Sequence, residues 1–286
     1  RISDYLIKPV NPNQILLSIK KNLESSRLVD EKITKGYQQE FRNISLELSS
    51  NLSFKEWYQV YKKIIYWELE LSKSDDSSID EIISMQKSEA NSQFFRFVSR
   101  NYEDWINNVE SPLLSHNLLE KKVFPILSNS SPVYLLLIDN LRYDQWKVIE
   151  DNILQKFKII DDSMYMSILP TATQYSRNSI FSGLRPSEIQ NLYPKKWLND
   201  EDEGGKNMFE EDFLKDQIKR LHLEHDKSSY TKITNIDYGR KVINKIDNMK
   251  HNNLNVIVYN FVDMLSHART EMKVIKELAD DDSAYR

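Results

Sequence analysis

Residues 133–144 read VYLLLIDNLRYD, an apolar run that stops at Asp139. A continuous apolar run, without polar alternation, is typical of a strand buried on both faces in a parallel sheet. Two further runs have the same character, MYMSILP at residues 164–170 and NVIVYNF at residues 255–261. We therefore predict three strands of an α/β fold in the second half of the chain.

Polar residues with catalytic potential follow each of these runs. Asp139 follows the first run, Thr171 and Thr173 follow the second, and Asp263 and His267 follow the third. Ligands of open α/β sheets bind at the carboxyl ends of the strands, so these side chains are expected to converge there. Carboxylates, an imidazole and a hydroxyl together favour a divalent metal site beside a nucleophile.

Residues 173–183, TQYSRNSIFSG, resemble the nucleophile helix of the alkaline phosphatase superfamily. In that superfamily a Thr, Ser or modified Cys begins a helix, and a small residue plus Gly close it ten positions later. Thr173 and Gly183 match this spacing, whereas Thr171, the competing nucleophile by residue type, lies two positions too far from Gly183. Arg177 stands where the sulfatase branch also carries Arg. The resemblance implies that Thr173 is the nucleophile and that Arg177 is a second catalytic residue.

The same resemblance implies a two-metal site. Asp139 matches the first metal ligand of the superfamily, and Asp263 with His267 matches its D-x-x-x-H ligand pair. Asp139 would hold the metal that touches Thr173, and the D-x-x-x-H pair would hold the second metal. Mixed Asp/His ligation suits zinc, with manganese as the alternative. The superfamily uses a further Asp-His pair and another His, which we expect beyond residue 286, so residues 1–286 alone should bind metal weakly and be inactive.

The sequence motif DNLRYD that begins at Asp139 resembles PglZ domains. The whole chain resembles the PorX-like response regulators that carry a PglZ effector domain. On this resemblance, residues 1–22 are the end of a receiver domain. The phosphorylated Asp would lie before residue 1, and Lys8 would contact it. Residues 23–125 are predicted as a helical bundle. Residues 126–286 are predicted as the N-terminal part of a three-layer α/β/α PglZ domain, and the chain is expected to be a fragment.

Helical spacing of apolar residues supports the predicted bundle. Ser53 and Glu56 form a capping-box pattern before the stripe that begins at Trp57. Aromatic stripes could also stack on nucleic acid, but their helical spacing and mixed-charge flanks favour a packed helix core. The side chains of one further stripe are Tyr37, Phe41, Ile44 and Leu48.

The segment between the predicted second and third strands contains a loop-rich insertion with an acidic helix near residues 209–221. The superfamily often places substrate-binding elements there, and Asn207 is a candidate phosphate contact, with a solvated loop residue as the alternative. His222 and His225 have metal-ligand spacing, but their amphipathic flanks favour surface histidines.

Composition excludes several classes of protein. The chain has 286 residues and a net charge of −4 with interspersed signs, so it lacks the basic surface of duplex nucleic-acid readers. It contains 0 Cys, which rules out disulfides and thiolate metal ligands and fits a cytoplasmic protein. No apolar run is long enough to span a bilayer.

Two functions remain open. The resemblance implies a phosphorylation-controlled, metal-dependent phosphodiesterase with oligonucleotide-type substrates, although phosphate monoesters and sulfate esters are not excluded. The alternative is a signalling adaptor that binds a sigma factor or another transcription partner. The implied partners include a cognate histidine kinase and a second copy in a phosphorylation-dependent homodimer, and the implied role is regulation of type IX secretion. The set Asp139, Thr173, Asp263 and His267 favours the enzyme, because an adaptor has no need of it.

Overall fold

The computed structural model describes residues 32–73, 77–107, 110–127, 131–199, 202, 205–223 and 227–271, without the side chains of 77–79, 270 and 271. The chain divides into two compact units between Glu103 and Asp104. The predicted receiver segment, with Lys8, lies outside the described residues. Among the helices that are described, none is both long and apolar enough to cross a bilayer.

The first unit is helical, which confirms the prediction for this part of the chain. Residues 32–48 form a helix, followed by α2 (Phe54–Leu71) and α3 (Ser77–Ile106). The predicted capping box begins α2: the Ser53 backbone N–H donates to Glu56 Oε2 at 2.7 Å, and Ser53 Oγ accepts from the Glu56 N–H at 3.4 Å. Two otherwise unpaired N–H groups of the helix start are thereby satisfied.

Aromatic side chains fill the interior of the first unit. Trp57 packs edge-on against Phe94, with ring centroids 5.3 Å apart, and Tyr37 donates a buried hydrogen bond to Gln86 Oε1 at 3.2 Å. The stripes are therefore helix core, as predicted. The buried apolar members of this core are Tyr37, Ile44, Leu48, Leu52, Trp57, Val60, Ile64, Leu71, Ile83 and Ala90.

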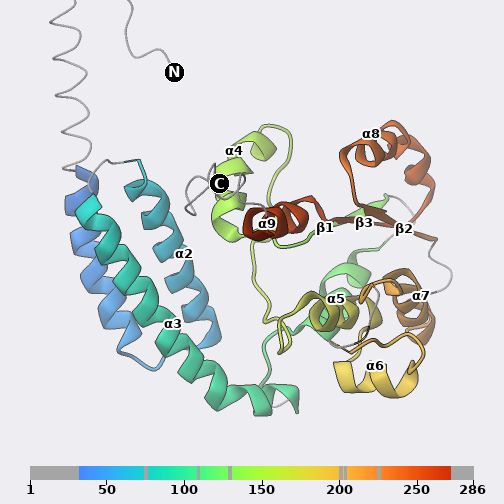
Figure 1. The fold of residues 1–286 in the computed structure, drawn as a ribbon, viewed down its shortest axis with the longest axis horizontal. Coiled ribbons are helices and arrows are strands. Elements are labelled where there is room, and N and C mark those ends of the chain that lie inside the picture. Colours follow the sequence, from blue (N-terminus) through green and yellow to red (C-terminus); the bar gives the residue numbers. More distant parts are fainter. Residues whose placement is uncertain are drawn as a thin grey trace, which may run out of the picture. The chain divides into compact units, whose positions relative to one another are not determined.

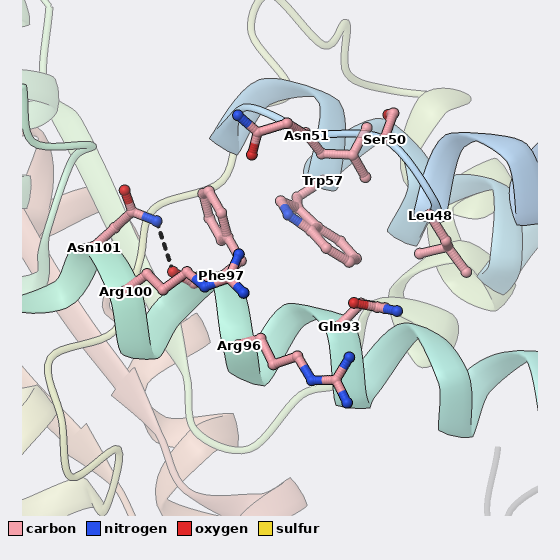
Figure 2. Close-up of a pocket in the computed structure, with 10 residues that line it drawn as sticks. Leu48, Ser50, Asn51, Trp57, Gln93, Arg96, Phe97, Arg100 and Asn101 are labelled. Carbon is pink, nitrogen blue, oxygen red and sulfur yellow. Dashed lines mark hydrogen bonds between the residues drawn. The ribbon is translucent and has the colours of Figure 1, made fainter.

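Figure 2 shows a pocket of the first unit between α3 and the turn that precedes α2. Trp57 and Leu48 line it with buried apolar surface, whereas the exposed Arg96 and Arg100 line it from successive turns of α3. Neither arginine forms an ion pair with any residue that the structure describes. The pocket is therefore lined by two solvent-exposed arginines.

The second unit is built on a parallel sheet of three strands within its described residues. The strands are β1 (Val133–Ile138), β2 (Ser228–Ile233) and β3 (Leu254–Tyr259), in the order β1-β3-β2. Leu254 is in register with Val133 on one side and with Ser228 on the other. All three carboxyl ends therefore lie at one edge of the sheet.

The helices of this unit are α4 (Tyr143–Leu154), α5 (Thr173–Ser182), α6 (Pro186–Leu192), α7 (Glu210–Arg220), α8 (Ile236–Asn244) and α9 (Phe261–Glu271), with short helical turns η1 (Ser115–Asn117), η2 (Leu119–Val123), η3 (Phe124–Ile126) and η4 (Ile246–His251).

Helices pack on both faces of the sheet, and β3 is buried from Leu254 to Val258 (Figure 1). One face packs Leu254, Val256 and Val258 against α5, α6 and α7, and the other packs Ile257 against α8. The unit is thus mixed α/β with three layers, as predicted.

Two strand assignments differ from the sequence prediction. Residues 164–170 form no strand: Met166 makes one isolated bridge to Leu114, and Pro170 has no N–H to continue a ladder. The third strand of the sheet is instead β2, whose sequence SSYTKI carries no apolar run. β2 is a strand because it pairs with β3 and not because it has an apolar run, so the apolar pattern could not identify it.

Gly183 is the residue at which α5 ends, and its backbone requires glycine. Its φ is 65°, in the left-handed region, and an added Cβ would lie 2.3 Å from the Gln217 side chain. Gly183→Ala is therefore expected to lower the free energy of unfolding by at least about 1 kcal/mol in urea titrations.

Gly239 provides the matched control for this substitution. It lies in α8 at negative φ, and a Cβ there would meet Ile233 at 3.4 Å, an ordinary contact. Gly239→Ala should raise stability by about 0.5–1 kcal/mol, since alanine loses less entropy in a helix. Equal effects of the two substitutions would contradict the role given to Gly183.

Candidate active site

Two strand ends meet at one buried arginine. Asp139 directly follows β1, with its N–H donating to Tyr259 O at 3.0 Å, and Asn260 directly follows β3, with its N–H donating to Ile233 O at 3.2 Å. Arg177 Nη1 donates to Asp139 Oδ2 at 2.7 Å and to Asn260 Oδ1 at 3.3 Å. The carboxyl edge of the sheet thus gathers polar side chains, as parallel strand order requires.

Helix α5 presents Thr173 as its first residue. The N-cap is Ala172, and Gly183 ends the helix ten positions later in the left-handed conformation, as the predicted spacing requires. The Thr173 hydroxyl makes no hydrogen bond with any described residue. Thr171 lies outside the helix and is exposed. Thr173 therefore combines a free hydroxyl with a helix start, where N–H groups and the helix dipole favour an anion.

Glu210, the first residue of α7, is the most heavily bonded carboxylate of this region and is 1% exposed. Its Oε2 accepts from Arg177 Nη2 at 2.6 Å, from the Tyr230 hydroxyl at 2.7 Å and from Lys232 Nζ at 3.2 Å. Its Oε1 accepts from Asn207 Nδ2 at 3.2 Å. A buried carboxylate needs such compensation, and two cations supply it here.

The charges of this cluster shift one another's pKa values. Burial raises the pKa of Asp139 above its usual value, Arg177 acts to lower it, and Asp263 raises it again. Burial acts to lower the pKa of Arg177, but the carboxylates of Glu210 and Asp139 raise it above its usual value. Arg177 therefore stays charged, while Asp139 ionises less readily than a solvated carboxyl.

Asp263 and His267 lie one turn apart on α9. His267 Nε2 is 3.7 Å from Asp263 Oδ1, and their side chains are 67% and 25% exposed, respectively. The carboxylate of Asp263 is one of the groups that raise the pKa of Asp139. His267 is the more exposed residue of the Asp263–His267 pair.

The donor types fit a divalent cation, but the described residues hold no cluster of three or more His, Cys, Asp or Glu side chains that could bind one. Asp139 and Asp263 offer hard oxygen ligands, and Thr173 and His267 add a hydroxyl and an imidazole. Zinc usually takes three or four protein ligands, so these groups account for part of a binding site.

The remaining predicted residues have different positions. Asn207 bridges the two halves of the site, since its Nδ2 also donates to Thr173 O at 3.1 Å. His222 is exposed in the turn after α7, with φ of 56°. His225 and the acidic residues 280–282, which could also have supplied ligands, lie outside the described residues, as does Lys8.

Sequence reasoning missed four contributors to this site: Glu210, Tyr230, Lys232 and Asn260. A signal for Glu210 was present, because it shares an apolar helix face with Phe213, Leu214 and Gln217 at spacings of three, four and seven. A carboxylate on such a face is buried and must be paired. Tyr230 and Lys232 gave no such signal, because their strand was not recognised.

Comparison with known families gives two matches along the chain. Residues 118–285 match the family described as the BREX system PglZ alkaline phosphatase-like domain. Residues 27–106 match the PorX response regulator linker domain. A comparison with curated proteins found no match.

The raised pKa of Asp139 makes the stability of the metal-free protein depend on pH. Folding raises the pKa of this carboxyl, so it ionises more easily in the unfolded chain than in the folded protein. Its contribution to the free energy of unfolding therefore falls as pH rises from about 4, the unfolded pKa, through the pKa in the folded protein. The Asp139→Asn variant lacks this titrating carboxyl. Its free energy of unfolding should therefore increase relative to that of wild type over the same pH range. Urea unfolding at several pH values, with chelator present, measures the difference. A variant that loses stability relative to wild type as pH rises would contradict the direction of the shift.

Proposed function

The chain belongs to the PglZ alkaline-phosphatase-like family, and on that premise we propose that it is a metal-dependent phosphodiesterase with Thr173 as its nucleophile. Membership places it among the alkaline-phosphatase-like hydrolases. The observation that carries the finer proposal is the position of Thr173. It is the first residue of α5, its hydroxyl is free, and Arg177 on the same helix donates a hydrogen bond to Asp139. Nucleophile and first predicted ligand are thereby held by one buried contact.

Each residue of the site has a chemical task in this proposal. Thr173 would attack phosphorus, and the first N–H groups of α5 would bind a phosphoryl oxygen. Asp139, Asp263 and His267 would hold zinc, or manganese, which lowers the pKa of a bound hydroxyl and neutralises charge on the phosphoryl group. Asn207 holds the Thr173 carbonyl rather than pointing into solvent, so it would position the nucleophile.

Arg177 has both terminal nitrogens engaged with carboxylates and is 4% exposed. These contacts favour a role in orienting Asp139 over direct contact with substrate. The catalytic role predicted from the resemblance stays a prediction.

The match to the PorX linker domain supports a regulated enzyme. The order of linker domain and PglZ domain is that of a PorX-like protein with a PglZ domain. We propose that a receiver domain, phosphorylated by a histidine kinase, controls the hydrolase through this linker and through dimerisation, in regulation of type IX secretion. Oligonucleotide-type phosphodiesters are the proposed substrates, and binding of a sigma factor stays a prediction.

Thr173→Ala in the full-length protein should abolish hydrolysis of a chromogenic phosphodiester, because the covalent route needs the hydroxyl. The expected loss is at least about 1,000-fold in kcat, with the metal content unchanged. Steady-state kinetics and elemental analysis measure the two quantities.

Thr171→Ala is the matched control, since Thr171 is also a threonine of this segment but lies before the helix. It should keep activity within a few-fold of wild type. An active Thr173→Ala together with an inactive Thr171→Ala would assign the nucleophile to Thr171.

Removal of the metal should also abolish activity. Dialysis of the full-length protein against a chelator is expected to stop phosphodiester hydrolysis, and added Zn²⁺ or Mn²⁺ should restore it. Circular dichroism should show that the fold is retained. Full activity in a sample that elemental analysis shows to be metal-free would refute the proposed metal dependence.

A further inference from the structure

We infer that Glu210 is the positioning residue of this site: through Arg177 it holds the Asp139 carboxylate in the orientation that leaves one oxygen open for a divalent cation. The inference rests on the proposed function, because it assigns Asp139 to a metal. It concerns a residue on α7, an element of the insertion that lies far in sequence from the strand ends.

Arg177 divides its two terminal nitrogens between two carboxylates. Nη2 donates to Glu210 Oε2 at 2.6 Å, and Nη1 donates to Asp139 Oδ2 at 2.7 Å. Asp139 Oδ1 accepts no hydrogen bond from any residue that the structure describes. Since Glu210 occupies one half of the guanidinium, Arg177 can reach only one oxygen of Asp139, and the other stays open.

Glu210 is itself fixed from the opposite side. The Tyr230 hydroxyl and Lys232 Nζ both donate to the oxygen that Arg177 also contacts, and Lys232 donates to Asn207 O at 3.0 Å. Both donors come from β2, the strand that pairs with β3. These hydrogen bonds restrict the orientation of Glu210, and its contact with Nη2 restricts that of Arg177.

The second oxygen of Glu210 is linked through Asn207 to Thr173, the proposed nucleophile. Its Oε1 accepts from Asn207 Nδ2 at 3.2 Å, and the same amide donates to Thr173 O at 3.1 Å. One buried carboxylate thus sets the position of both Asp139 and the start of α5. Groups that orient a metal ligand in this way commonly change metal affinity by about 10- to 100-fold when removed.

Loss of Glu210 would release one half of the guanidinium. Arginine pairs with a carboxylate most favourably through two parallel hydrogen bonds, so the released Arg177 should turn both nitrogens to Asp139 and cover Oδ1. A cation would then have to displace the arginine. Metal affinity should fall although Glu210 is not a ligand.

The test is the affinity of the full-length protein for Zn²⁺, measured by competition with a chromophoric chelator and independent of catalysis. Glu210→Gln should bind Zn²⁺ about 10-fold or more weakly than wild type. Gln217→Leu is the matched control: Gln217 is a comparably buried polar residue of α7, 2% exposed, and it forms no hydrogen bond with Arg177. Its Zn²⁺ affinity should equal that of wild type.

Glu210→Asp separates positioning from charge. It keeps the negative charge but shortens the side chain by one methylene, so the carboxylate cannot reach both Arg177 and Asn207. Positioning predicts a loss of affinity in Glu210→Asp as well, whereas a purely electrostatic effect predicts a loss in Glu210→Gln alone. Because it retains the charge, Glu210→Asp also serves if Glu210→Gln does not fold.

The outcomes are distinct. Weaker Zn²⁺ binding by both Glu210 variants, with Gln217→Leu unchanged, supports the inference. Unchanged affinity in Glu210→Asp, or an equal loss in Gln217→Leu, overturns it while leaving the proposed function intact. Wild-type protein that binds no divalent cation refutes the proposed function itself.

Discussion

The buried guanidinium of Arg177 is the interaction on which the second unit depends. It lies between Asp139, which follows β1, and Glu210, which begins α7, and it also reaches Asn260 after β3. Burying a charged group is costly unless it is paired and hydrogen-bonded, and removal of one partner leaves an uncompensated charge. The pairing therefore connects the sheet, helix α5 and the start of α7.

The sheet explains why this arrangement lies where it does. Parallel strands must be connected by crossovers, so their carboxyl ends meet at one edge while helices cover both faces. β3, in the middle of the described strands, is buried from Leu254 to Val258 and pairs in register with both neighbours. The positions of Asp139 and Asn260 at the strand ends follow from that register. The proposed metal site would need such preorganisation, since ligands must stand in place before the cation binds.

The helical unit has an apolar and aromatic core. A capping box begins α2, and aromatic rings such as those of Trp57 and Phe94 pack between helices. This unit matches the PorX response regulator linker domain and forms a compact unit of its own. The charge network around Glu210 lies in the other unit, so under the proposed function regulation and ligand positioning would use separate parts of the chain.

The sequence by itself determined the elements with strong local signals. The apolar runs of β1 and β3, the capping box at Ser53, and the spacing from Thr173 to Gly183 were all readable, because burial and capping act on neighbouring residues. Only the tertiary structure decided which polar groups meet. The polar strand β2 and the pairing of Glu210 with Arg177 depend on contacts between segments about 30 residues apart, as in the separation of 33 between those two residues. Such contacts are fixed by the order of the strands in the sheet. The apolar face of α7 indicated that Glu210 is buried, but its pairing with Arg177 could be identified only in the structure.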